Sequence, residues 1–293
     1  MASVQQLKSR IRSVSSTRQI TKAMELVAAS KMRRATTAVK ETTDYARATR
    51  ELLADLAHDR ETIARHAMFQ QRPIKKRLLI VISSDSGLAG AYNSNILKTF
   101  VKELREDDAR HVATETLTLG RKISQFASRL KDASVLGSFE KLPDRATGVE
   151  IKSILQMMLD SFRDQTCDAV DIIYTRFNSS ISQEVVVERL LPAGLMGAGE
   201  FANVSDNLRE SKFEPSRSVV LDAVVARMIE TEIVQALLDS RASEHSMRMM
   251  AMKNATDNAN GLVDDLTLAM NKERQAAITQ ELSEISAGAE AVR

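Results

Sequence analysis

Residues 78–90 read LLIVISSDSGLAG and decide the fold of the middle of this chain. The continuous apolar run over 78–82 is typical of a strand that is buried on both faces of a parallel sheet. The polar, glycine-bearing residues 83–90 predict a turn, and the pattern from Asn93 to Glu106 predicts a helix. Together they predict the first strand, turn and helix of an α/β domain.

Further strands and helices alternate along the middle of the chain. Strands are expected over 114–119, 169–177 and 182–190, the last of them at an edge. Helices are expected up to Leu130 and over 149–162. This alternation predicts a small, mostly parallel, Rossmann-like sheet covered by helices.

The two ends of the chain differ in composition from its middle. The first 72 residues contain no glycine or proline, and the last 78 contain no proline and no aromatic residue. Glycine and proline disfavour helices, whereas aromatic side chains fill wide globular cores. We therefore expect long helices in segments 1–72 and 211–293, which flank a central α/β domain over 73–210. Because these helices are the two ends of one chain, they can pair as a long antiparallel coiled coil.

Apolar spacing predicts the faces along which the two helices pair. In the N-terminal helix one stripe is followed, after a phase shift, by a second: Val4, Leu7, Ile11 and Val14, then Ile20, Met24, Val27 and Lys31. The C-terminal helix has a row at heptad spacing: Ile229, Ile233, Ala236, Ser240, Ser243, Met247, Met250 and Asn254. Small and polar residues weaken such a seam, which favours a coil that also contacts or slides against other surfaces.

Charge and cysteine content narrow the function classes. The net charge is only +2, but the first 40 residues hold nine cations and a single acid, Glu25. A field this one-sided suggests an acidic partner or an anionic surface. Cys167 is the only cysteine, so neither an internal disulfide nor a thiolate metal cluster is possible, and we expect an inert, structural thiol. Apolar runs are far shorter than a membrane span.

The glycine turn is the strongest candidate for a nucleotide site. Asp85, Gly87 and Gly90 stand where a Rossmann phosphate loop would, but their spacing matches neither phosphate-binding motif. The structural alternative is that the glycines let the turn close and that Asp85 caps the following helix. We also find no specific catalytic constellation. We therefore expect the chain to have no catalytic, cofactor-binding or metal site, and we expect Asp85, Gly87 and Gly90 to form a structural turn.

The C-terminus carries an apolar stripe where chain ends are usually polar and frayed. Ile278, Leu282 and Ile285 share one helical face, and residues 287–292 follow almost without charge. An apolar end on a helix of this length implies a partner that buries it.

Several motifs resemble those of one family, the gamma subunits of F-type ATP synthases. They occur in the same order along the chain: ITKAMELVAASKMRRA (20–35), SDSGLAG (84–90) with Asn93, SQE to LLP (182–192), AMKNATDNA (251–259) and RQAAITQELSEISAGA (274–289). The departures are modest: Ser86 replaces the family's usual Arg or Lys, and Ala89 its frequent Cys. The absence of a presequence favours a bacterial member.

The resemblance implies a rotor shaft without catalytic residues. In this family the terminal helices form a coiled coil inside a ring of alternating alpha and beta subunits. The globular domain rests on the membrane ring of c subunits beside epsilon. One copy of the chain per complex is implied, attached peripherally to the cytoplasmic face of the bacterial membrane through the c-ring. Rotation couples ion flow to ATP synthesis or hydrolysis, and no cofactor and no nucleic acid are implied.

The resemblance also implies which residues meet the ring. Arg274, Gln275 and Thr279 match the family's polar catch with a beta subunit, and Met24 matches the position that faces the acidic lever of beta. Other contacts with the alpha/beta ring are implied for Glu281, Leu282 and Ile285. A basic contact face for acidic groups on beta or the ring below is implied for Lys22, Lys31, Arg33 and Arg34.

Two other function classes remain as alternatives to the shaft. One is a stand-alone α/β enzyme, for which the isolated chain would bind a nucleotide tightly. The other is a coiled-coil adaptor or nucleic-acid-binding protein, for which salt-sensitive binding to DNA or RNA would be the signature. Against nucleic acid, no aromatic residue interleaves with the N-terminal cations before Tyr45.

Overall fold

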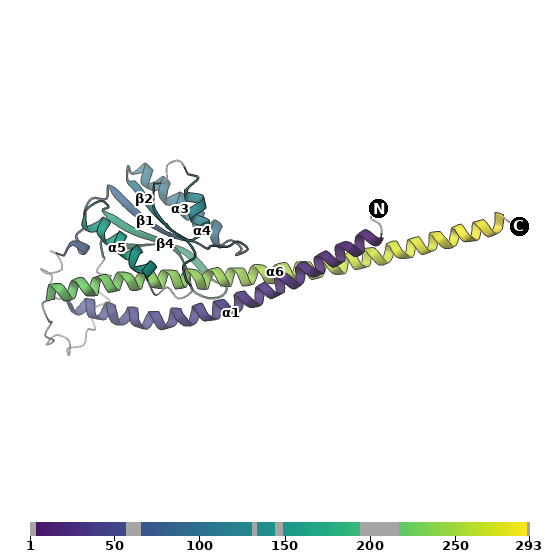
Figure 1. The fold of residues 1–293 in the computed structure, drawn as a ribbon, viewed down its shortest axis with the longest axis horizontal. Coiled ribbons are helices and arrows are strands. Elements are labelled where there is room, and N and C mark those ends of the chain that lie inside the picture. Colours follow the sequence, from purple (N-terminus) through teal and green to yellow (C-terminus); the bar gives the residue numbers. More distant parts are fainter. Residues whose placement is uncertain (1–3, 57–65, 131–133, 144–148, 194–216, 292–293) are drawn as a thin grey trace. The chain divides into compact units, whose positions relative to one another are not determined.

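The computed structural model describes residues 4–56, 66–130, 134–143, 149–193 and 217–291 (Figure 1). It contains two compact units, one made of Met1–Ala29 with Arg248–Arg293 and the other of Ser30–Met247. The two long helices, α1 (Val4–Leu56) and α6 (Arg217–Ala291), each contribute to both units. The division of the chain at residues 72 and 210 thus stays a prediction about sequence segments.

The second unit contains a five-stranded sheet in the order β3-β2-β1-β4-β5. Its strands are β1 (Lys76–Ile82), β2 (Ala113–Leu119), β3 (Ser134–Phe139), β4 (Ala169–Phe177) and β5 (Gln183–Leu191). The first four are parallel, and β5 pairs antiparallel with β4 at an edge. The α/β fold and four of the strands are therefore as predicted.

The strand β3 is the one that sequence patterns missed. Ser134 and Ser138 are polar, Val135 and Leu136 are more than a third exposed, and Gly137 interrupts the apolar residues. An edge strand of this kind shows neither a continuous apolar run nor a clean alternation of apolar and polar residues. It is recognised only by its pairing with β2.

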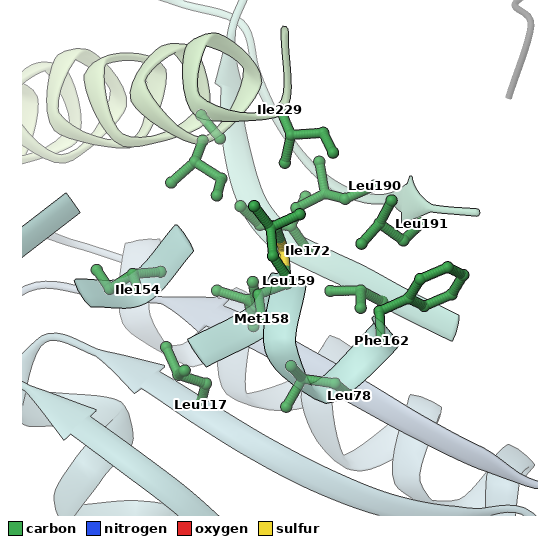
Figure 2. Packing of buried hydrophobic residues seen from close by; sticks show 14 of the residues in the cluster. Leu78, Leu117, Ile154, Met158, Leu159, Phe162, Ile172, Leu190, Leu191 and Ile229 are labelled. Atoms are coloured by element: carbon green, nitrogen blue, oxygen red, sulfur yellow. The ribbon is translucent and has the colours of Figure 1, made fainter. Parts of the chain in front are cut away.

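Helices cover both faces of the sheet. On one face α3 (Tyr92–Ala109) and α4 (Arg121–Ala127) enclose a core around Leu79, Val81 and Ile173. On the other, α5 (Val149–Arg163), the short 3-10 helix η1 (Ala67–Phe69) and α6 pack against the alternate side chains of the strands. Figure 2 shows this second core, in which Ile172 from β4 lies among side chains of α5 and Ile229 of α6.

The heptad row of α6 packs on this domain, and its prediction as a coil seam is wrong. Ile229, Ile233 and Ala236 are buried in the core of the sheet. Farther along the row, the hydroxyls of Ser240 and Ser243 bond to the backbone of β4. Beyond the domain Met250 is 39% exposed, and Asn254 is exposed as well. The small and polar residues of the row therefore fit a helix to a strand instead of weakening a coil.

The first unit is an antiparallel coil of α1 and α6, as predicted. Thr21 contacts Thr256, and Arg18 contacts Asn260, so positions rise along one helix as they fall along the other. The inward face of α1 runs at seven-residue intervals through Leu7, Val14, Thr21 and Ala28, and the buried residues of α6 described in this unit are Arg248, Met252, Thr256 and Ala259.

The predicted phase shift in α1 does not occur. Ile20 and Val27 are 58% and 57% exposed, whereas the neighbouring Thr21 and Ala28 face inward. The apolar character of Ile20 and Val27 led to a stripe one residue out of phase with the true seam. At this point the seam carries the small residues Thr21 and Ala28, and the larger Ile20 and Val27 lie outside it.

Candidate partner-contact surfaces

The C-terminal part of α6 extends beyond the coil. The contacting pairs Thr21–Thr256 and Arg18–Asn260 have position numbers that sum to 277 and 278, which places Val4 at the level of Glu273 or Arg274. Burial agrees, because Glu273 is half-buried and every residue described from 274 to 287 is exposed. About 18 helical residues, 274–291, thus extend roughly 27 Å past the first described residue of α1.

This overhang carries all the candidate contacts of the C-terminal signature. Polar residues are present along it, with the Thr279 hydroxyl bonded to the backbone carbonyl of Gln275 at 2.9 Å. The apolar stripe is open to solvent, with Ile278 49%, Leu282 60% and Ile285 68% exposed. All six predicted contact residues of this region are exposed on the overhang: Arg274, Gln275, Thr279, Glu281, Leu282 and Ile285.

A second apolar surface lies on the outer face of α1 in the same unit. Ile20 and Val27 are each more than half exposed, and Met24 on the same side of the helix is half-buried. Leu26, 60% exposed, lies on another side of α1 near Lys22, which forms an ion pair of 3.0 Å with Glu25, so part of its charge is neutralised within the helix. The exposure of Leu26 was missed by sequence reasoning. The signal was available in the seven-residue spacing of the small residues Thr21 and Ala28, which marks the opposite face as inward.

The other predicted cations lie in the second unit. Lys31, Arg33 and Arg34 line a hollow of about 430 Å³ between α1 and α6. The α6 side of the hollow contributes Leu238, Arg241 and His245. The hollow therefore brings three of the four cations of the basic contact face together, while Lys22 belongs to the other unit.

Asp85 connects the glycine turn to the start of α4 and does not cap the helix that follows the turn. The carboxylate accepts hydrogen bonds from the backbone N–H of Arg121, the first residue of α4, at 3.0 Å and from that of Lys141 at 3.2 Å. The helix α3 begins after Ala91, which makes no side-chain cap bond. Sequence distance misled the prediction, because the parallel sheet brings the ends of β1 and β2 side by side.

Of the two glycines in the turn, only Gly90 has a backbone conformation that favours glycine. Gly90 has a φ of 56°, in the left-handed region that favours glycine, whereas a Cβ at Gly87 would meet nothing within 4 Å. Leu88 between them also has a positive φ, 59°, and is 63% exposed. Asn93 completes the turn, since its amide oxygen accepts from the backbone N–H of Ser84 at 3.2 Å.

A small cavity lies at the carboxyl ends of β1 and β2. Rossmann-like folds bind ligands at the carboxyl ends of the strands, where the strand order reverses, which is here between β1 and β4. The cavity at the ends of β1 and β2 has a volume of about 40 Å³, and Leu237, Ser240, Arg241 and Glu244 of α6 help to line it. A drug-sized ligand needs roughly 300 Å³ or more. The cavity at the ends of β1 and β2, one strand away from the reversal, therefore has no room for a nucleotide.

Cys167 is buried, and desolvation raises the pKa of its thiol to about 11. A thiol that stays protonated is a poor nucleophile and metal ligand, in keeping with the expected structural role. Within the described residues, no group of three or more His, Cys, Asp or Glu side chains is placed to hold a metal ion. In the same part of the chain, no helix is both long enough and apolar enough to cross a membrane.

Known proteins match this chain in sequence over its whole length. The family model described as ATP synthase matches residues 3–292. The ATP synthase gamma chain of Xylella fastidiosa (strain M12) is 39% identical over 292 residues, with all of both chains covered. That of Cupriavidus pinatubonensis is 38% identical over 296 residues, also with full coverage of both.

Solved structures have the same fold. The central stalk and c-ring structure of the Tetrahymena thermophila mitochondrial ATP synthase includes a chain that is 26% identical, with a TM-score of 0.57 over 80% of this chain and 99% of that one. A chain of the Euglena gracilis mitochondrial enzyme gives a TM-score of 0.67 over 99% of this chain and 94% of that one, at 16% identity. On the full-length sequence matches, this chain belongs to the ATP synthase gamma chain family.

Proposed function

We propose that this chain is the central rotor shaft of an F-type ATP synthase. Its rotation inside a ring of alternating alpha and beta subunits couples transmembrane ion flow to ATP synthesis or hydrolysis on the beta subunits. The full-length match to gamma chains and the likeness to a chain of a solved central stalk support this function. The structural observation that carries it is the overhang of α6, whose apolar stripe is exposed in the isolated chain.

The overhang has the properties of a shaft end that is held in a sleeve. Most helical stability in proteins comes from the packing of an apolar face, so a helix end that extends beyond its coil would be stabilised by contacts from a partner. Ile278, Leu282 and Ile285 offer an apolar face to such a sleeve. Arg274, Gln275 and Thr279 lie where the helix leaves the coil and would form the polar catch with a beta subunit. Glu281 lies in the same exposed turn as Leu282.

The α1 surface provides the second contact with the ring. Ile20 and Val27 are exposed apolar residues on the side of α1 that carries Met24, which would face the acidic lever of a beta subunit. The hollow with Lys31, Arg33 and Arg34 offers positive charge to acidic groups on beta or on the ring below. A surface of small and partly exposed apolar residues suits a shaft that meets three equivalent partners in turn, because no single contact is strong enough to hold it in one rotational position.

In this proposal the shaft itself is not catalytic. The cavity at the ends of β1 and β2 holds only about 40 Å³, and residues of α6 help to line it. The chemistry then belongs to the beta subunits, and the shaft acts by presenting different faces to them. The α/β domain would rest on the c-ring beside epsilon, with one shaft in each complex. This places the chain peripherally on the cytoplasmic face of a bacterial membrane, as suits its bacterial relatives.

Reconstitution with the alpha and beta subunits of the same organism tests the proposal. We expect a stable complex with one copy of this chain per three alpha–beta pairs, and multi-site ATP hydrolysis that requires the chain. The matched control is Lys272→Ala, an exposed change in α6 before the overhang, which should leave assembly intact. Failure of the full chain to assemble, with alpha and beta competent to bind another gamma chain, would refute the shaft function.

A further inference from the structure

Two threonines form a buried polar pair in the middle of the coil of the first unit. Thr21 on α1 and Thr256 on α6 are 9% and 7% exposed, and their hydroxyl oxygens lie 2.8 Å apart. Each hydroxyl also lies within bonding distance of a carbonyl of its own helix, that of Arg18 at 3.0 Å and that of Met252 at 2.8 Å. Each hydroxyl has one proton, so the bond across the coil forms when Thr256 donates to Thr21 instead of to the Met252 carbonyl, while Thr21 donates to the carbonyl of Arg18.

The apolar residues of the coil do not select one register. Residues at seven-residue intervals face inward on α1, so sliding it by one heptad along α6 again places inward side chains opposite inward side chains. In the observed register the numbers of contacting residues add to 277 or 278, and a slide of α1 by seven residues toward the C-terminus of α6 raises this to about 284. Such a slide would bring Val14 to the level of Met270. The same slide would bring Thr21 to the level of Val263, and the bond between the two hydroxyls would be lost.

We propose that Thr21 and Thr256 set the register of the coil and so determine how far α6 extends beyond α1. A polar pair buried in a coiled-coil seam is a known device for register, because its partner-matched hydrogen bond exists in one alignment only. Arg18 and Asn260, which are 3.3 Å apart, contact each other one turn away. That contact is exposed to solvent and therefore discriminates less between registers.

The register determines which residues of the C-terminal signature lie on the overhang beyond α1. A slide of one heptad toward the C-terminus of α6 would bring residues 274–280 to the level of the first turns of α1. Arg274, Gln275 and Thr279 would then lie beside α1 instead of on the overhang. Only this consequence for the catch rests on the proposed function. The register itself is a property of the isolated chain and can be tested without any partner.

Distances between two spin labels in the isolated full-length chain test the proposal. Nitroxides are attached at Lys8→Cys and Asn254→Cys, both exposed positions about 15 residues apart along the coil, in a chain that carries Cys167→Ala. A slide of one heptad moves the labels by roughly 10 Å along the axis, at 1.5 Å per residue. Pulsed electron paramagnetic resonance resolves such a shift. The variants are Thr21→Val with Thr256→Val, which keeps shape, and Thr21→Ser with Thr256→Ser, which keeps both hydroxyls.

The expected result is one distance in the parent and in the serine pair, and a second population shifted by about 10 Å in the valine pair. A valine pair with only the parent distance would overturn the proposal, as would a serine pair with a second population. If circular dichroism shows that the valine pair is unfolded, Thr256→Val alone is measured. There a second population supports the proposal, and the parent distance alone overturns it.

Discussion

The hydroxyl of Ser240 on α6 accepts a hydrogen bond of 3.2 Å from the backbone N–H of Thr175 on β4. Ser243, on the next turn, donates to the carbonyl of the same Thr175, also at 3.2 Å. The register of β4 with β1 ends at Ile173, so Thr175 lies past the part of the strand that β1 accompanies. Two serines of a helix thus bond to backbone groups at the end of a strand and join α6 to the sheet.

Ser240→Ala should destabilise the α/β domain. The change leaves the buried N–H of Thr175 without this partner, which costs about 1–3 kcal/mol of the free energy of unfolding. Urea denaturation and amide hydrogen exchange at Thr175 measure the effect. Ser283→Ala, on the exposed end of the same helix, is the control and should change neither. Unchanged exchange at Thr175 in Ser240→Ala would contradict the assigned bond.

Gly120 and Gly87 are predicted to respond in opposite ways to alanine. Gly120 has a φ of 104°, and an added Cβ would lie 2.2 Å from the carbonyl oxygen of Ser83. We expect Gly120→Ala to lower the free energy of unfolding by about 3 kcal/mol or more. Gly87→Ala meets no atom within 4 Å and should be neutral or stabilise by up to about 1 kcal/mol. Thermal and urea unfolding of the two variants compare them directly, and equal losses would be inconsistent with this geometry.

Asp239 should make the stability of the protein depend on pH in a mildly acidic range. Desolvation at the contact of α6 with the sheet raises the pKa of its carboxyl to about 6, partly offset by Gln235 and Arg176, while Glu188 adds to the rise. The folded protein therefore holds this proton more tightly than the unfolded chain does. The contribution to stability is present below about pH 4 and is lost as the pH rises to about 6, up to about 3 kcal/mol in all.

Asp239→Asn removes the titrating group and should flatten this part of the profile. Urea denaturation at intervals between pH 4 and 8 measures the free energy of unfolding for both chains. Asp108→Asn, an exposed change on α3, should keep the slope of the parent. A parent profile that rises with pH over this range would contradict the assignment to a buried carboxyl.

Replacement of Arg274 and Gln275 by alanine should weaken coupling without unfolding the chain. Both side chains are exposed on the overhang, so the free energy of unfolding should change by less than about 0.5 kcal/mol. If they form the catch, ATP synthesis driven by an ion gradient should fall about tenfold, as expected for the loss of a charge-assisted hydrogen bond. The same two measurements on Lys272→Ala provide the control. Intact assembly and synthesis in the double variant would remove the catch from the proposal.

Met24→Lys should reduce the efficiency of coupling. Met24 is half-buried on α1, and an added cation there would bind an acidic lever too strongly. We expect less ion pumping per ATP hydrolysed and a steeper temperature dependence of synthesis. Met250→Lys, which places the same charge on α6 at a 39% exposed position, tests whether charge alone is responsible. Equal coupling in Met24→Lys and the parent would end the lever assignment.

Local patterns were enough for most of the α/β domain. The apolar run of β1 and the alternation of strands and helices depend on burial on both faces of a sheet, which leaves a direct mark on composition. The same patterns could not find β3, because an exposed edge strand is defined by pairing with its neighbour. They also assigned the cap of Asp85 to the wrong helix, since α4 is distant in the chain and close in the sheet.

The amino-acid sequence by itself determined the long helices, the α/β domain, the polar and apolar content of the C-terminal signature and the family resemblance. Only the tertiary structure decided which face of each helix is inward. It assigned the row with Ile229 and Ser240 to the sheet and left Ile20 and Val27 exposed. The physical reason is that a periodic apolar or small residue records burial, whereas the identity of the element that buries it depends on packing between distant segments.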